Sequence, residues 1–262
     1  LGNEAVSTLA QPLRLVRQTN AFGAGEGEAV RLFSWGAAAR DSAAFLAVSD
    51  SGTLKVWSEG GTRTVEGKSV TCAAWSADGG HLAYGSGKSV AVLQSSFELA
   101  FDVELSHQDF DIKTNSVAWL SRDSLLVMCM TEAGEDAEEE ELAFCFTVKF
   151  SLGSGGEFQK VCVNRVDEDS ACIALDEEGA PLGTGPYLHH CQIQEWKTSI
   201  IAHRKSVGDC SISILAADES TPGFNSVEVL QDGFDDADSL RPAIPLRTDE
   251  DEGDDFIVGM QV

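Results

Sequence analysis

The stretch VTCAAWSADGGHLAYGSGKSVAVLQ, residues 70–94, decides the fold. It contains three apolar runs separated by the turn sequences Asp78-Gly79-Gly80 and Gly85-Ser86-Gly87. Glycine tolerates the positive φ angles that tight turns require, and runs of this length between turns are typical of β-strands. The stretch therefore predicts consecutive antiparallel strands in an all-β protein.

The pattern recurs on both sides of this stretch. A looser copy runs from Val30 to Trp57, and a degenerate copy runs from Asn115 to Phe150. Trp35, Trp75 and Trp119 mark equivalent places in the three copies, with separations of 40 and 44 residues. A period of about 40–45 residues is typical of WD40-type repeats, each of which forms one four-stranded blade. We therefore expect residues 1–262 to form a single β-propeller domain.

The remaining segments are assigned more coarsely. We expect residues 59–67 to connect the first blade to the second, and residues 97–112 to hold an outer strand followed by a loop. Strands are also expected near Ala171–Leu175, within residues 187–215 and near Phe256–Met260. Apolar positions with helical spacing are not evident anywhere, so no helix is predicted.

The chain is strongly acidic. It has 18 Lys and Arg against 43 Asp and Glu, which gives a formal net charge of −25. Such a protein repels phosphate backbones, which argues against direct nucleic-acid binding, and it attracts basic partners. Acidic residues gather in segments 131–141, 231–238 and 249–255. These segments are either solvated loops that keep the protein soluble or an electronegative surface for an Arg- or Lys-rich partner.

The cysteines indicate the compartment. There are seven, and most stand in apolar runs where cysteine behaves as a small buried side chain. Their odd number and the absence of a C-x-x-C pair favour a reducing environment such as the cytosol or nucleus. No apolar run reaches 18 residues and the start of the chain lacks a signal-peptide pattern, so we expect no insertion into a membrane.

Three segments imitate chemical sites. Gly85–Ser89 resembles the end of a phosphate-binding loop, but that motif requires glycine where Leu82 stands and a helix where Val90–Leu93 predicts a strand. The trio His189–Cys191 cannot converge on one metal ion from an extended strand. Segment 249–255 does not match the glycine and glutamate positions of a calcium loop. We therefore predict no catalytic residue, no cofactor and no metal, and hence a protein that is not an enzyme.

Four segments together resemble a known family. They include Tyr187 followed by Glu195-Trp196, and a later combination of Ile244-Pro245-Leu246, an acidic run and Gly259-Met260. The segments are 70–94, 116–128, 187–215 and 241–262. In this order they resemble the N-terminal β-propeller of the large cytoplasmic-filament nucleoporin family of the nuclear pore complex.

The resemblance implies a seven-bladed propeller at the cytoplasmic side of the nuclear pore complex. In that family the propeller docks the DEAD-box RNA helicase of mRNA export, whose basic surface is gripped by acidic and polar loops, and segments outside the propeller contact other nucleoporins. The residues expected to contact the helicase here are Asp50, Glu135, Asp136 and Glu138. Seven blades need roughly 300 residues, so the chain is expected to lack at least one N-terminal blade. The alternative is a generic WD40-like scaffold in another complex, such as a ubiquitin-ligase adaptor.

Overall fold

A computed structural model describes most of the first half of the chain and parts of the second. The described residues are 22, 29–36, 44–58, 61–65, 69–131, 142–152, 158–165, 186–193, 198–203, 213–217 and 227–229. Within them, sixteen strands form four antiparallel sheets of four strands each. None of these residues lies in a helix, so the described part contains no helix that could cross a membrane.

The strands of each sheet follow chain order. Blade 1 contains β1 (Val30–Trp35), β2 (Phe45–Ser49), β3 (Leu54–Ser58) and β4 (Gly61–Val65). Blade 2 contains β5 (Val70–Trp75), β6 (His81–Ser86), β7 (Ser89–Gln94) and β8 (Leu99–Glu104). Blade 3 contains β9 (Ile112–Ser121), β10 (Ser124–Thr131), β11 (Ala143–Leu152) and β12 (Phe158–Arg165). Blade 4 contains β13 (Leu188–Ile193), β14 (Thr198–His203), β15 (Ser213–Ala217) and β16 (Val227–Val229).

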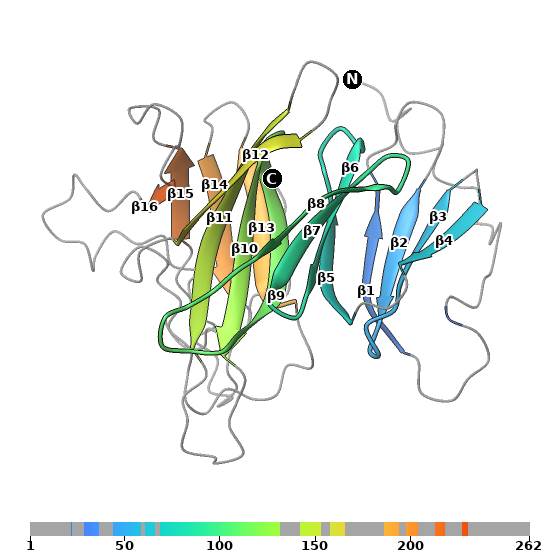
Figure 1. The fold of residues 1–262 in the computed structure, drawn as a ribbon, viewed down its shortest axis with the longest axis horizontal. Coiled ribbons are helices and arrows are strands. Elements are labelled where there is room, and N and C mark those ends of the chain that lie inside the picture. The colour runs from blue at the N-terminus through green and yellow to red at the C-terminus, as the bar shows by residue number, and fades with distance from the viewer. Residues whose placement is uncertain are drawn as a thin grey trace, which may run out of the picture.

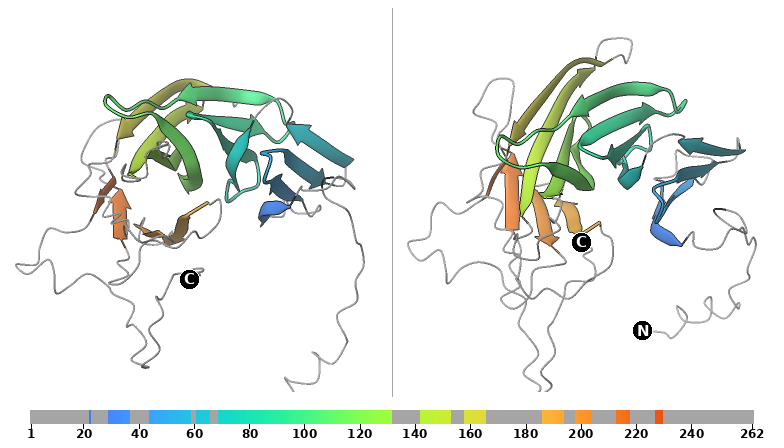
Figure 2. Two further views of the ribbon diagram at one scale, coloured as in Figure 1. Left: turned by 90° about the horizontal axis from the view of Figure 1, so that it is seen from below. Right: turned by 60° about the horizontal axis from the view of Figure 1, so that its bottom comes forward.

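The four blades follow one another around an arc. Figures 1 and 2 show the sheets standing side by side in chain order, each turned relative to the one before. The first strands of successive blades, β1, β5, β9 and β13, contact one another in sequence. These strands therefore line the inside of the arc, as the first strand of each blade does in a β-propeller. The predicted all-β propeller architecture is confirmed.

One predicted connection is wrong. Residues 59–67 were expected to join blades 1 and 2, but residues 61–65 within them form β4, which pairs with β3 from Leu54↔Val65 to Ser58↔Gly61. β4 is the outermost strand of its sheet, and four of its five residues are exposed. An exposed edge strand needs no apolar pattern, so the sequence GTRTV gave no strand signal.

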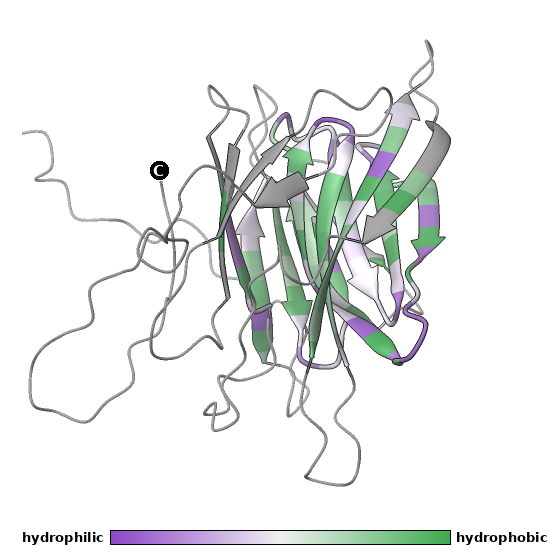
Figure 3. Cartoon of the chain, turned by 90° about the vertical axis from the view of Figure 1, so that its left-hand side faces the viewer, coloured by the Kyte–Doolittle hydropathy of each residue, from purple (hydrophilic) through white to green (hydrophobic). Residues whose placement is uncertain are grey.

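Apolar residues fill the spaces between consecutive blades, and Figure 3 shows them running along the strands of the stacked sheets. On β6, Leu82 and Tyr84 pack toward blade 1, while Ala83 packs toward blade 3. Both faces of such a strand are buried, which explains why the sequence shows continuous apolar runs rather than alternation. Three clusters result, one between each pair of neighbouring blades.

The three tryptophans occupy equivalent places, as predicted. Trp35, Trp75 and Trp119 each stand at or near the end of the first strand and pair with the second strand of their blade. Trp119 is 7% exposed and packs on blade 2, whereas Trp35 is 65% exposed. The ring of Trp75 lies against Gly36 of blade 1, where an added Cβ would be 3.2 Å from Trp75 Cε2. Each of the two covered tryptophans is therefore part of the contact with the preceding blade.

Other expectations fall outside the described residues. They are the strands near Ala171–Leu175 and Phe256–Met260, Trp196, and the acidic segments 231–238 and 249–255. The number of blades and the expected absence of an N-terminal blade stay predictions.

Candidate functional site

The end of the sheets that carries the turns between second and third strands is the candidate contact surface. Antiparallel strands alternate in direction. In the first three blades the turns between the second and third strands therefore all lie at this end. The loop from β8 to β9 lies at the same end (Figure 1). We call this end the turn face and define it by residues 50–53, 86–88 and 105–111, by Thr131 at the end of β10 and by Leu142 just before β11.

Asp50, a predicted contact residue, lies exposed on the turn face. Its backbone N–H donates to the carbonyl of Ala29 over 3.1 Å. In the same turn, the Ser49 hydroxyl accepts the N–H of Thr53 at 3.0 Å. The carboxylate of Asp50 has no hydrogen-bond or ion-pair partner among the described residues, so a partner's cation can approach it.

The turns are anchored to the next blade. The carbonyl of Gly52 accepts the N–H of Val70 at 2.8 Å, and the carbonyl of Gly87 accepts the N–H of Thr114 at 2.7 Å. Both glycines have positive φ, +83° and +56°. The same bond thus recurs at two blade boundaries, and it holds the turn face in a fixed shape.

This anchoring also explains the segment that imitates a phosphate-binding loop. Gly87 and Lys88 form the turn from β6 to β7, as predicted, and Val90 belongs to a strand. The Lys88 ammonium lies 2.8 Å from Glu104 Oε1. That hydrogen bond raises the pKa of Lys88. Lys88 is therefore paired with a carboxylate, and among the described residues no helix N-terminus stands beside it to bind phosphate.

The acidic insert leaves the sheet at the turn face. Its ends are held together, because Thr131 N–H donates to the carbonyl of Leu142 at 2.9 Å and Leu142 N–H donates to Thr131 Oγ1 at 2.9 Å. The predicted contact residues Glu135, Asp136 and Glu138 lie outside the described residues. The structure therefore brings the turn of Asp50 and the base of the insert to one end of the sheets.

An aromatic cluster at the base of the insert was not found from the sequence. The His107 ring lies 4.3 Å from the ring of Phe144 and 5.1 Å from that of Phe110, and the Phe110 and Phe144 rings are 5.6 Å apart. Phe110 is 42% exposed and stands between the exposed Asp109 and Asp111. The signal was present in the sequence His107-Gln-Asp-Phe-Asp, where a large apolar residue interrupts a polar loop. Exposed aromatic side chains of this kind are typical of interface anchors.

Metal binding finds no support in the described part of the chain, where no group of three or more His, Cys, Asp or Glu side chains could hold an ion. His189, His190 and Cys191 are consecutive on β13 and pair with Ala202, Ile201 and Ile200. Burial lowers the pKa of His190 to about 4, so this side chain is neutral at pH 7. Its surroundings are those of a residue packed in a sheet.

Comparisons with known proteins show the fold. No protein-family model matches the chain, and no curated protein matches its sequence. An S. cerevisiae complex described as a Dbp5 variant bound to Nup159, a Gle1 variant, IP6 and ADP contains a similar chain, with a TM-score of 0.51 and 15% identity. The crystal structure of the N-terminal domain of Nup159 gives a TM-score of 0.52 and 15% identity. Each match covers 79% of this chain and 53% of the other, so the chain spans about half the length of these structures.

Proposed function

We propose that this protein is a docking component of the nuclear pore complex that recruits a DEAD-box RNA helicase for mRNA export at the cytoplasmic face. The observation that carries the proposal is the turn face, a fixed surface that presents Asp50 and from which a segment with seven acidic residues, Glu132–Glu141, departs. A rigid acidic surface suits a basic protein partner, because complementary charge speeds association and selects the partner.

The fold likeness supports the same role. The N-terminal domain of Nup159 is among the similar structures, and one similar chain comes from a complex in which a Dbp5 variant is bound to Nup159. The similar propellers are binding scaffolds, which supports a docking protein rather than an enzyme. Contacts with other nucleoporins are assigned to segments outside this chain.

The test is direct binding of the purified helicase to this chain at two ionic strengths. Between ionic strengths of about 0.01 M and about 0.15 M the Debye length falls from about 30 Å to about 8 Å, so contacts through exposed charges weaken. We expect binding at the lower value and weaker binding at the higher value. Absence of binding at low ionic strength would overturn the proposal.

Charge reversal then locates the contact. Asp50→Lys and the triple reversal of Glu135, Asp136 and Glu138 to Lys should each slow association. The matched control is Glu98→Lys, since Glu98 is exposed in the turn from β7 to β8 at the opposite end of the sheet. If all three variants bind equally well, the partner does not use the turn face.

The second candidate is a WD40-like scaffold in another multiprotein complex. The absence of a matching family model favours it, because a propeller without family-specific sequence is compatible with many partners. This alternative would be supported if the chain did not bind the helicase but did bind other basic proteins, and if Asp50→Lys weakened that binding.

A further inference from the structure

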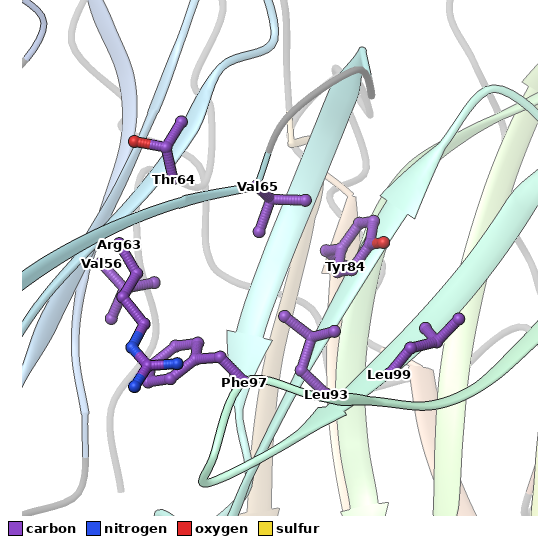
Figure 4. Close-up of a pocket in the computed structure, with 8 residues that line it drawn as sticks. All are labelled: Val56, Arg63, Thr64, Val65, Tyr84, Leu93, Phe97 and Leu99. Atoms are coloured by element: carbon purple, nitrogen blue, oxygen red, sulfur yellow. The ribbon is translucent and has the colours of Figure 1, made fainter.

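A pocket of about 480 Å³ lies between the outer strands of blades 1 and 2. Figure 4 shows its apolar lining, formed by Val56 and Val65 of blade 1 and by Tyr84, Leu93, Phe97 and Leu99 of blade 2. Leu99 is 58% exposed although it belongs to β8. A concave apolar site at the boundary between two structural units is a common location for a bound ligand or peptide side chain.

A single cation marks one side of the pocket. The Arg63 guanidinium lies 5.2 Å from the centre of the Phe97 ring, and Arg63 Nη1 donates to the carbonyl of Ser96 at 2.7 Å. A guanidinium has five N–H donors in a fixed plane, so donors remain after this bond. Among the described residues, no carboxylate pairs with Arg63.

The pocket wall is held in shape before any ligand binds. Phe97 has φ of 65°, the one positive φ among the described residues other than glycine, and its N–H donates to the carbonyl of Gln94 at 2.8 Å. Its ring also makes an edge contact with Trp75, with centres 6.4 Å apart. Side chains in uncommon backbone conformations persist only where the surroundings fix them, and they gather at binding sites.

The other side of the pocket offers no positive charge, since Arg63 is the one charged residue among those that line it. Burial and the nearby Asp102 carboxylate raise the pKa of Tyr84. A carboxylate placed beside Tyr84 would meet no cation among the lining residues, whereas one placed beside Arg63 would be attracted. The pocket therefore has a polarity that can orient a ligand.

We infer that this pocket binds a short extended peptide in which a large apolar side chain stands next to a carboxylate. The apolar side chain would enter between Val65 and Leu99, and the carboxylate would accept hydrogen bonds from Arg63. Planar pairing of arginine with a carboxylate is among the stronger hydrogen-bonded contacts in proteins. The occupant differs in charge from the basic partner proposed for the turn face, so the two sites take different ligands.

The experiment uses the intact chain and a phage library of random heptapeptides as the probe. We expect enrichment of peptides that place Phe, Leu or Ile beside Asp or Glu. For a selected peptide, Arg63→Ala should weaken binding about tenfold, because a hydrogen bond to a charged group is lost. Leu99→Ser removes the exposed apolar wall without touching the core and should weaken binding several-fold.

The matched control is Arg122→Ala, which removes an exposed arginine from the turn between β9 and β10 and should leave peptide affinity unchanged. Failure to enrich any peptide, or enrichment of the same peptides by Arg63→Ala, would overturn the inference. Dimerisation that depends on Leu99 would overturn it as well. So would peptide selection that succeeds only after the acidic segment 249–255 is deleted, because the chain itself would then occupy the pocket. Helicase binding by Arg63→Ala is expected to match that of the parent, which separates this site from the proposed function.

Discussion

The indole Nε1 of Trp119 lies 3.0 Å from the carbonyl oxygen of Ala74 and donates a hydrogen bond to it across the boundary between blades 3 and 2. Its ring meets that of Phe150 edge-on, with centres 5.9 Å apart. Trp119 thus buries its apolar ring at the blade boundary, and its one polar group, the indole N–H, has a hydrogen-bond acceptor there. Its counterpart in blade 1, Trp35, has the same place in its strand but lies largely in solvent.

This difference predicts unequal effects of truncation. Trp119→Ala should lower the free energy of unfolding by about 3–5 kcal/mol, because it opens a cavity at a packed boundary. Trp35→Ala should cost about 1 kcal/mol or less, since a largely exposed side chain contributes little. Urea unfolding of both variants measures the difference. Equal losses would mean that Trp35 is covered in solution.

A pair of glycines tests the anchoring of the turns. Gly52 and Gly61 both have positive φ, +83° and +111°, so alanine is strained at either position. A Cβ on Gly52 would lie 2.9 Å from Ser69 Cα and from the Val70 nitrogen, whereas a Cβ on Gly61 would meet nothing within 4 Å. Gly61→Ala should therefore cost about 1–2 kcal/mol from backbone strain alone. Gly52→Ala should cost clearly more, because backbone atoms of the next blade must move.

Thermal unfolding of the two glycine variants gives the comparison. A Gly52→Ala protein as stable as Gly61→Ala would show that the turn of blade 1 is not tightly docked on blade 2. The parent chain under identical conditions is the reference for both.

Sequence reasoning succeeded where the pattern is local. The apolar runs and glycine turns of residues 70–94 were sufficient to predict β5, β6 and β7, and the spacing of the tryptophans was sufficient to predict the repeat. It failed for β4, because an exposed edge strand carries little apolar signal. The pocket around Arg63 depends on residues brought together from different strands, and no local pattern in the sequence indicates it. The cluster around Phe110 had a local signal in the sequence His107-Gln-Asp-Phe-Asp, but its contact with Phe144 of a distant strand had none.

Buried thiols predict an alkaline limit to stability. Burial raises the pKa of Cys72 to about 11 and that of Cys145 to about 12, from an ordinary value of 9.0. Between pH 9 and pH 11 these thiols ionise in the unfolded chain but stay protonated in the folded one. The unfolded state therefore binds fewer protons, and the free energy of unfolding should fall by about 1.4 kcal/mol per pH unit for each thiol.

Denaturant titrations at several pH values measure this slope. Cys72→Ala should be less stable at pH 7, since it loses a buried side chain, but its stability should fall less steeply above pH 9. The native protein at pH 8 should also resist alkylation of Cys72 and Cys145 by iodoacetamide, because the thiolate is the reactive form. A variant whose alkaline slope equals that of the parent would contradict the assignment.

The proposed docking of a helicase on the turn face predicts a role for Phe110. Complementary charge sets mainly the rate and the selectivity of the encounter, whereas aromatic anchors carry much of the binding energy of many interfaces. Phe110→Ser should therefore weaken helicase binding by about tenfold or more, mainly through faster dissociation. Asp50→Lys should act instead on the association rate, since a charge at the rim of an interface steers the encounter.

Surface plasmon resonance separates the two rates. Leu99→Ser is the matched control for Phe110→Ser, because it replaces another exposed apolar residue at a site away from the turn face, and it should leave both rates unchanged. Phe110 itself is 42% exposed, so Phe110→Ser should change the free energy of unfolding measured in urea by no more than about 1 kcal/mol. If Phe110→Ser and Leu99→Ser bind the helicase equally, the aromatic cluster stabilises the base of the insert and takes no part in recognition.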